Sequence, residues 1–413
     1  RDASRVLGLP FSAGDKVAKL MPPMILGNTA TLSECLQLDE ENNSGYSKEF
    51  YTASAELRNQ YKNDEEVKRI IDIALGLEGL RRQDGIHAAA VVISPEAITN
   101  YLPVQKKGKD AELVTQFEMH TVEQLGLLKM DFLGLRNLSI IDRTVELINN
   151  EDFNIDEIPL DDKKTFELFS TGRMIGVFQL ESRIAQITAR SLKPTRFEEI
   201  VALVAFIRPG PLGANMHIEF ADRATGKKEI EFLHTDLKEI LEETYGVILY
   251  QEQVMQIAQK ISAFQLDEAD DLRKAMGKKI PKVMEQQRKK FTDGAISNGY
   301  SEQFSIELFD QIAFFAGYGF NKSHSVPYAL IAYQTAYLKA NHPAEYLSAC
   351  LTAVKRDKDR TAIFLAEARE LGVNVKTPDI NLSIEDFSVA NGEILFGLSA
   401  IRNVGDVTAE KIV

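Results

Sequence analysis

The spacing of hydrophobic positions changes several times along the 413-residue chain. Between residues 31 and 80, apolar residues recur with helical spacing among acidic interruptions, which predicts a small helical module entered through the Pro-rich stretch MPPMIL. Between 87 and 133, short β-branched or alternating runs separated by Pro, Gly and Lys-Gly turns predict three or four strands. These runs are HAAAVVIS, YLPVQK, LVTQF and LGLLKMDFL.

Helical spacing then dominates up to about residue 350. The predicted helices are NLSIIDRTVELINN, KTFELFS, FEEIVALVAFI, LKEILEETYG, QEQVMQIAQKISAF, SIELFDQIAFFAG and PYALIAYQTAYLKANH. From about 375, PDINLS and DFSVANGEILFGLSAIRNVG predict a small β or turn unit that leads into a new helix. The expected fold class is α+β, mostly helical and multidomain.

Composition is that of an ordinary globular protein, with 44% hydrophobic and 26% charged residues. Two cysteines, Cys35 and Cys350, form no disulfide framework and have no partner at metal-ligand spacing, so we expect a reducing, cytosolic location. The longest apolar run, residues 200–207, is too short for a membrane span. The chain starts without Met and reads as a fragment of a longer protein. Phosphate-loop, GxGxxG, HExxH, CxxC and GxSxG motifs are absent, which argues against common ATPases, dehydrogenases, metalloproteases and hydrolases.

Charge is unevenly distributed. The net charge of −13 argues mildly against a surface that binds nucleic acid throughout, yet residues 273–290 hold eight basic residues and one acidic residue. Arg273 and Lys274 share a helical neighbourhood with Lys278, and we expect Gly277 to interrupt the helix there. A solvated charged face and a triphosphate site are both open interpretations.

Lys129 and Asp131 are two apart in LGLLKMDFLGL, where the strand period places Leu125, Leu127, Lys129, Asp131 and Leu133 on one face. A carboxylate in an apolar strand needs a partner or a metal. The simpler interpretation is a Lys-Asp ion pair or a turn cap. The alternative is one ligand of a Mg²⁺ site beside a phosphate-binding lysine, which would require further carboxylates.

Three other motifs have simple structural interpretations. Arg208 follows an apolar helix and precedes Pro-Gly-Pro, where a cation stabilises the helix end. In GVFQLES, Ser182 is expected to cap the next helix and Gln179 to be a buried hydrogen-bonding residue. His87, at the start of a strand, is expected to be structural.

Seven collinear blocks together resemble the C-family replicative DNA polymerase, the α subunit of bacterial DNA polymerase III. They are HAAAVVIS, LLKMDFLGLRNLSIID, GVFQLES, AFIRPGPL, TYGVILYQEQVMQIAQ, LRKAMGKK and FAGYGFNKSHS. The resemblance implies a small nucleotidyltransferase-like palm sheet with helical thumb and fingers. Its domains would be the end of the first palm segment at 1–9, the thumb at 10–86, the second palm segment at 87–136, the fingers at 137–350, and the start of the clamp-binding region, with a partial helix-hairpin-helix, at 351–413.

The same resemblance implies roles for single residues. Asp131 would be the third catalytic carboxylate and a Mg²⁺ ligand, and Lys129 the lysine that approaches the primer terminus. The dNTP-binding residues would be Arg208, Arg273, Lys274, Lys278, Lys322 and His324. DNA would be bound by Lys289, Lys290, Val404 and Gly405. Lys274 stands where some relatives have arginine, so it would act as a point charge.

The implied activity is transfer of a dNMP from a dNTP to a primer 3′ hydroxyl by a two-Mg²⁺ mechanism. Primed template DNA, dNTPs, the β sliding clamp and other replisome subunits would be the partners, without a membrane. The Asp-x-Asp pair that completes the metal site is absent from this chain, as are the PHP domain, the internal clamp-binding motif and the OB domain. The alternative is therefore a non-catalytic nucleotide- or DNA-binding module or a replisome scaffold.

Overall fold

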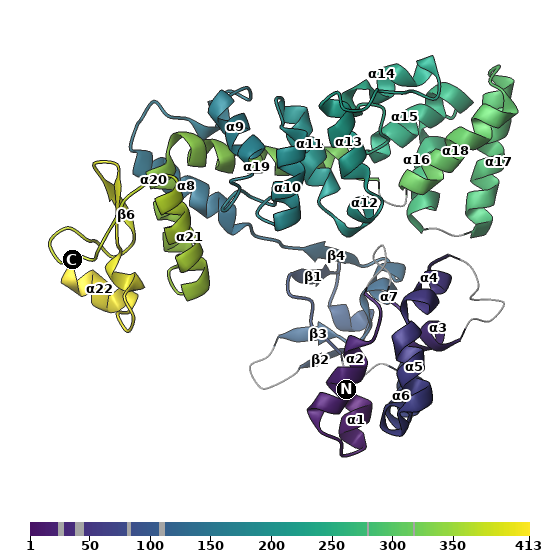
Figure 1. Cartoon of the computed structure of the whole chain (residues 1–413), viewed down its shortest axis with the longest axis horizontal. Coiled ribbons are helices and arrows are strands. Elements are labelled where there is room, and N and C mark those ends of the chain that lie inside the picture. The colour runs from purple at the N-terminus through teal and green to yellow at the C-terminus, as the bar shows by residue number, and fades with distance from the viewer. Residues whose placement is uncertain (24–28, 38–44, 81–83, 107–111, 279–280, 317–318) are drawn as a thin grey trace. The chain divides into compact units, whose positions relative to one another are not determined.

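The computed structural model describes residues 1–413 except 24–28, 38–44, 81–83, 107–111, 279–280 and 317–318. The chain forms two compact units, Arg1–Leu135 and Arg136–Val413 (Figure 1). Most of the chain is helical and the sheets are small, which confirms the expected mostly helical α+β class.

The first unit begins with a helical module. Its helices are α1 (Asp2–Val6), α2 (Phe11–Lys19), α3 (Leu32–Leu36), α4 (Gly45–Ala53), α5 (Ala55–Asn63) and α6 (Glu65–Leu77). Thr31 and Glu34 form a capping box at α3, and Asp64 caps α6 by accepting bonds from two backbone N–H groups. Cys35, Leu57 and Ile71 are fully buried between these helices. The predicted helical module is confirmed, although part of MPPMIL lies outside the described residues.

Four short strands follow, as predicted, but they form two separate antiparallel pairs. Strand β1 (Ala90–Ile93) pairs with β4 (Leu128–Asp131), and β2 (Val104–Lys106) pairs with β3 (Leu113–Thr115). A short 3-10 helix, η1 (Ile98–Asn100), and α7 (Met119–Gln124) lie between them in sequence. The predicted five-residue face is wrong, because Leu125 ends α7 and Gly126 turns with φ +78° before the strand begins.

The second unit consists mainly of helices. They are α8 (Arg136–Ile148), α9 (Lys163–Thr171), α10 (Arg183–Leu192), α11 (Phe197–Phe206), α12 (Pro209–Gly213), α13 (Met216–Ala224), α14 (Lys238–Leu241), α15 (Gln251–Ser262), α16 (Leu266–Lys278), α17 (Pro281–Ser297), α18 (Glu302–Ala316), α19 (Lys322–Asn341), α20 (Pro343–Val354) and α21 (Lys358–Glu370). The predicted helices are confirmed except LKEILEETYG. There α14 is a single turn flanked by the 3-10 helices η3 (Thr235–Leu237) and η4 (Glu242–Thr244), because Tyr245 and Gly246 both adopt positive φ.

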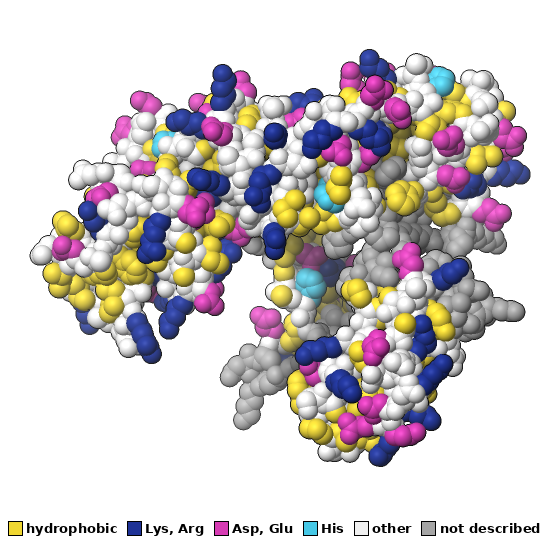
Figure 2. All heavy atoms as spheres, viewed as in Figure 1, with side chains coloured by type: hydrophobic (Ala, Val, Ile, Leu, Met, Phe, Trp, Pro, Cys, Tyr) yellow, Lys and Arg dark blue, Asp and Glu magenta, His cyan; other side chains and the backbone are white. Residues whose placement is uncertain are grey.

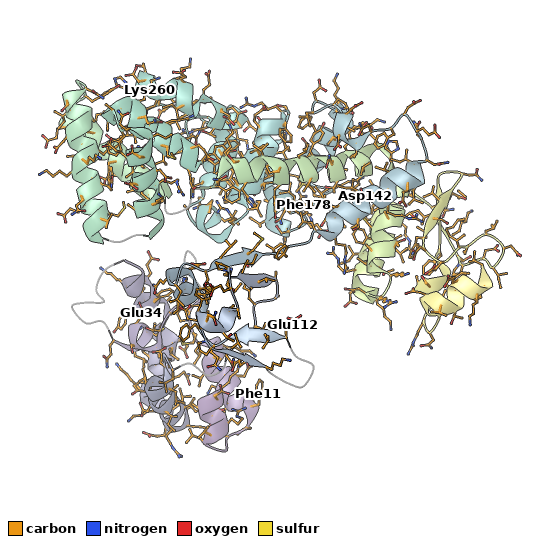
Figure 3. The ribbon with its side chains drawn as sticks, turned by 180° about the vertical axis from the view of Figure 1, so that it is seen from behind. Phe11, Glu34, Glu112, Asp142, Phe178 and Lys260 are labelled. Carbon is orange, nitrogen blue, oxygen red and sulfur yellow. The ribbon has the colours of Figure 1, made fainter. Side chains whose placement is uncertain are left out.

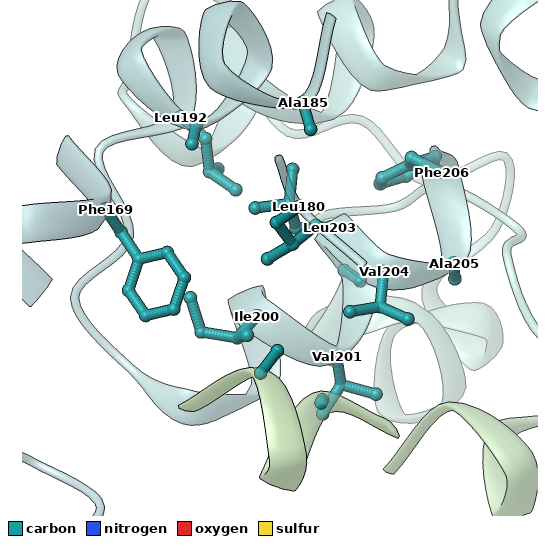
Figure 4. Packing of buried hydrophobic residues seen from close by; sticks show 14 of the residues in the cluster. Phe169, Leu180, Ala185, Leu192, Ile200, Val201, Leu203, Val204, Ala205 and Phe206 are labelled. Atoms are coloured by element: carbon teal, nitrogen blue, oxygen red, sulfur yellow. The ribbon is translucent and has the colours of Figure 1, made fainter. Parts of the chain in front are cut away.

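Helix α11 is at the centre of the first core of this unit. Its residues from Ile200 to Phe206 are all apolar, and every residue from Glu199 to Phe206 is buried. Figure 4 shows its residues Ile200, Leu203 and Phe206 clustered with Phe169 and Leu192 of neighbouring helices. A second core fills the space between α15, α16, α17 and α18. Two rigid cores therefore support the loops that connect these helices.

The C-terminal part is the predicted small β unit. Strands β5 (Val375–Lys376), β7 (Glu393–Leu395) and β6 (Ser388–Ala390) lie side by side in that order, with β5 parallel and β6 antiparallel to β7. A 3-10 turn, η5 (Leu398–Ala400), leads to α22 (Asp406–Ile412). Within the described residues, no helix has both the length and the apolarity that a bilayer crossing requires.

Candidate nucleotide and DNA site

Asp131 lies at the end of β4, next to Lys129. The Lys129 ammonium nitrogen is 2.9 Å from Oδ1 and 2.8 Å from Oδ2 of Asp131. This bond lowers the pKa of the Asp131 carboxyl, so the group is an anion at neutral pH. The Asp131 side chain is 40% exposed, whereas that of Lys129 is 14% exposed. The ion pair expected from the spacing is confirmed, and the carboxylate remains accessible.

His87 has the structural role expected of it. Its Nδ1 accepts hydrogen bonds from the backbone N–H groups of Ala89 and Ala90. The same nitrogen is 3.7 Å from Oδ1 of Asp131. His87 therefore fixes the start of β1, whose Ala90 lies directly opposite Asp131 in the strand register.

Phe320 joins three of the sequence blocks in the second unit. Its backbone N–H donates to Leu249 O, and its carbonyl accepts from Gln251 N at 2.9 Å. The Arg208 guanidinium stacks over the Phe320 ring at 4.0 Å from the centroid. The His324 ring is also near, with its centroid 5.5 Å from that of Phe320. The aromatic residue of GFNKSH thus places Arg208 and His324 beside the segment before α15.

Arg208 also meets the expectation of a helix-end cation. Its Nε donates to the carbonyl of Ala205 near the end of α11, at 3.1 Å. Burial lowers the pKa of this guanidinium.

Arg273 reaches the same junction through Gln251. Its Nη1 is 3.4 Å from Gln251 Oε1, and Gln251 Nε2 donates to the Gly319 carbonyl at 3.2 Å. Arg273 and Lys274 both pair with Asp270, at 2.8 and 2.7 Å. The expected helix break at Gly277 is wrong, because α16 continues through Gly277 to Lys278. The Lys278 side chain lies outside the described part, as does Gly317 in the GYGFNKSH block.

Lys322, the first residue of α19, is held by two glutamates. Its ammonium nitrogen is 2.7 Å from Glu243 Oε2, and its backbone N–H donates to Glu252 at 2.9 Å. The ammonium lies 5.5 Å from the ring centre of Tyr250. Burial and nearby glutamates raise the Tyr250 pKa, so this hydroxyl stays protonated. Asn321 caps the helix by accepting from His324 N.

The remaining expected DNA contacts lie in two separate places. On α17, Lys289 is exposed, and Lys290 pairs with Glu268 at 2.7 Å. Val404 and Gly405 form the turn before α22, following Asn403 at φ 69°. Figure 2 shows Lys and Arg interspersed with Asp and Glu on the visible face. Within the described part of the basic stretch, Arg273 and Lys274 pair with Asp270, Arg288 with Asp310 and Lys290 with Glu268, so part of its charge is neutralised.

Sequence reasoning missed the groups that hold these cations in place. Glu243, Glu252 and Asp270 are ordinary acidic residues in the sequence, and only their contacts identify them. Gln179 is exposed with φ 61°, so the buried role expected for it is wrong. Ser182 does cap α10, as predicted.

Comparison with known proteins covers nearly the whole chain. Residues 1–134 match the family described as "Bacterial DNA polymerase III alpha NTPase domain", and residues 137–299 match "Bacterial DNA polymerase III alpha subunit finger domain". Residues 372–413 match "Helix-hairpin-helix motif". Curated relatives include the DNA polymerase III subunit alpha of Mycobacterium tuberculosis, 43% identical over 98% of this chain. The chain belongs to the bacterial DNA polymerase III α-subunit family.

Other members of the α-subunit family are equally similar. The DNA polymerase III subunits alpha of Escherichia coli and Thermus aquaticus are each 43% identical over 100% of this chain. The chain spans about a third of the length of these relatives, which is 35% for Escherichia coli and 33% for Thermus aquaticus. The expected family is confirmed.

Proposed function

We propose that this chain contributes to template-directed DNA synthesis as part of a longer replicative polymerase α subunit. The observation that carries the proposal is the junction at Phe320. Arg208 and His324 contact its ring. Arg273 is bonded to Gln251, whose backbone N–H donates to the Phe320 carbonyl, and Lys322 follows two residues later in the chain. In this proposal, residues 1–9 and 87–136 belong to the palm, 10–86 to the thumb, 137–350 to the fingers and 351–413 to the start of the clamp-binding region.

The cations around Phe320 suit a triphosphate. In this proposal Arg208, Arg273, Lys274 and Lys322 would supply the positive charge and His324 a ring donor, with Lys278 as a further contact of the bound triphosphate. In the structure Arg273, Lys274 and Lys322 are paired with the carboxylates of Asp270 and Glu243. The phosphate oxygens of a bound dNTP would replace these carboxylates as partners of the three cations. These residues would position the triphosphate and stabilise the charge on its leaving pyrophosphate.

Asp131 fits a Mg²⁺ ion as one ligand. It is an accessible, ionised carboxylate, which is the donor type that Mg²⁺ prefers. The described residues contain no group of three metal-binding side chains, so the other two carboxylates would come from outside this chain. Bound Mg²⁺ would supply charge neutralisation at the reacting oxygens. Lys129 would orient Asp131 and donate to the primer terminus.

DNA would be bound at the two remaining places. Lys289 and Lys290 would contact phosphates from α17, and the Val404–Gly405 turn would present backbone amides to a phosphate without reading sequence. The β sliding clamp and other replisome subunits would be partners of the longer protein.

Primer extension by the longer polypeptide that carries this chain tests the proposal. Asp131→Asn keeps the shape of the side chain but removes its charge, so we expect extension to fall by at least about a thousandfold. Primed-DNA affinity should change little. Asp142→Asn, at an exposed carboxylate of α8 (Figure 3), is the matched control and should extend normally. Extension by Asp131→Asn at the wild-type rate would refute the assignment of Asp131.

A binding module is the second candidate for the 413-residue chain by itself. Within the described residues Asp131 is bonded to Lys129 and belongs to no set of metal ligands, which favours binding without turnover. Mg²⁺-dependent extension by the chain itself would exclude this candidate.

A further inference from the structure

A cavity of about 710 Å³ lies within the second unit, and none of the residues assigned above to dNTP or metal lines it. Its walls are the start of α8, the loop between α9 and α10, the end of α20 and the start of α21. A volume of this size is typical of ligand sites in proteins.

Four cations line the cavity. Arg136, Lys355, Arg356 and Arg360 face two lining carboxylates, Glu181 and Asp357. Asp357 is used as the cap of α21, where it accepts bonds from the Asp359 and Arg360 N–H groups. Lys355 pairs with Asp386 and Asp406, and Arg360 pairs with Glu181. The candidates for holding an anionic ligand are therefore Arg136 and Arg356.

Two of these arginines have donors to spare. Arg356 has an 80% exposed side chain and pairs with Asp406. Arg136 is exposed and donates to the Ala353 carbonyl at 3.3 Å. A guanidinium has five N–H donors, so each of these arginines retains donors for phosphate oxygens. The Thr352 hydroxyl, another lining group, is buried and has no hydrogen-bond partner among the described residues.

The loop that forms one wall is rigidly held. The Tyr346 hydroxyl donates to the Gly176 carbonyl at 2.6 Å, and the Phe178 N–H donates to Thr335 Oγ1 at 3.1 Å. Figure 3 shows Phe178 in this loop, near the long helix α19. The next residue, Gln179, is held at φ 61°, which is unfavourable for a residue with a Cβ, and its side chain is exposed. Such strain is found preferentially at ligand sites.

The cavity is physically linked to the C-terminal hairpin. Lys355 and Arg356 both pair with Asp406, which directly follows the Val404–Gly405 turn. A strand that lies on this turn would therefore have its next phosphates close to Arg356.

We propose that this cavity binds the phosphodiester backbone of one single-stranded DNA segment, which rests on the polymerase function proposed above. Arg136 begins α8 and Arg356 lies between α20 and α21, so the two arginines come from different segments and can contact successive phosphates of one strand. Both lining phenylalanines, Phe178 and Phe364, are buried at 6% and 3% exposure, so the site offers no stacking platform. The contacts would go to phosphates, which carry no sequence information, so binding would be independent of base sequence.

The test uses fluorescence anisotropy of a labelled dT20 oligonucleotide with the 413-residue chain across a range of salt concentrations. The variant Arg136→Gln/Arg356→Gln removes two exposed side chains, so its melting temperature should match that of the wild type. Its affinity should fall about tenfold, and the slope of log K against log salt should flatten by about 1.4, or 0.7 for each lost phosphate contact. The control is Arg143→Gln, an ion-paired arginine on α8 that does not line the cavity, and it should bind as wild type does.

Three results would overturn the inference. Unchanged affinity and salt slope in the double variant would remove the cavity from the DNA path while leaving the polymerase function intact. If the double variant lost binding to fluorescent dATP but kept its binding to dT20, the cavity would be a nucleotide site instead of a DNA site. Failure of the wild-type chain to bind dT20 would overturn the inference, and failure of the longer polypeptide to extend a primer would separately overturn the proposed function.

Discussion

At the residue scale, one buried lysine, Lys339, holds a loop of the second unit in place. Lys339 has a fully buried side chain, and its ammonium nitrogen lies 2.7 Å from Glu367, from the Arg173 carbonyl and from the Ile175 carbonyl. This lysine ties α19 to α21 and to the loop that lines the cavity.

Replacing Lys339 by Met should destabilise the second unit by about 3–5 kcal/mol, because Glu367 would remain buried without its cation. Urea unfolding followed by circular dichroism measures the change. The double variant Lys339→Met/Glu367→Leu removes both charges and should recover part of the loss. A double variant less stable than Lys339→Met would contradict this account.

Tyr245 provides a pH prediction at the same scale. Burial, and then the hydrogen bond from its hydroxyl to Glu199, raise the pKa of Tyr245 from its ordinary value of 10.0 to about 12. A raised pKa means that the native state keeps a proton that the unfolded state loses. The stabilisation is thus complete below pH 10 and is lost between pH 10 and about 12.

Urea midpoints of wild type and Tyr245→Phe should therefore converge as pH rises from 10 to 12. Tyr101→Phe, at a 40% exposed tyrosine, is the control and should not change the profile. Parallel profiles of wild type and Tyr245→Phe would argue against the raised pKa.

At the scale of elements, two glycines in neighbouring helices differ in whether a side chain would fit at their position. A Cβ at Gly294 in α17 would lie 2.5 Å from the Ser262 carbonyl oxygen at the end of α15, whereas a Cβ at Gly277 in α16 would meet nothing within 4 Å. Gly294 therefore permits the close approach of α17 to the end of α15, whereas the space around Gly277 would accommodate a side chain.

Gly294→Ala should lower the free energy of unfolding by about 1–3 kcal/mol, because the backbone carbonyl cannot move away. Gly277→Ala should raise it by about 0.5–1 kcal/mol, because alanine restricts the unfolded chain more than glycine does. Thermal unfolding of the two variants compares them directly. If both substitutions changed the free energy of unfolding equally, the close approach of Gly294 to the Ser262 carbonyl would not limit the size of the side chain at position 294.

At the scale of the whole molecule, one apolar face in the first unit has no cover among the described residues. Val91 pairs with Met130 and Ile93 with Leu128 on the same face of the β1–β4 pair, and all four are 40–54% exposed. Adjacent exposed apolar residues on a two-stranded sheet favour association.

Sedimentation velocity should therefore show concentration-dependent association of the 413-residue chain. Val91→Lys/Met130→Lys should reduce it, because charges oppose burial of this face. Val6→Lys, at a 74% exposed residue of α1 outside the β1–β4 pair, is the control and should leave association unchanged. A chain that stays monomeric at all concentrations would refute this prediction.

The sequence by itself determined the family, the helical and strand segments and the Lys129–Asp131 pair. These depend on local periodicity and on residues two apart, and local sequence specifies both. It failed at Gly277 and at Leu125. A helix can tolerate a glycine when its neighbours pack well, as α16 does. The positive φ of Gly126 makes a turn after α7, so the strand starts only at Leu128.

Only the tertiary structure decided which charges meet. Asp270, Glu243 and Glu252 hold Arg273 and Lys322, and Phe320 gathers blocks that are more than a hundred residues apart, from Arg208 to His324. The cavity beside α20 likewise combines the starts of α8 and α21. Such pairings arise when helices pack around a shared core, and no local pattern in the sequence encodes them.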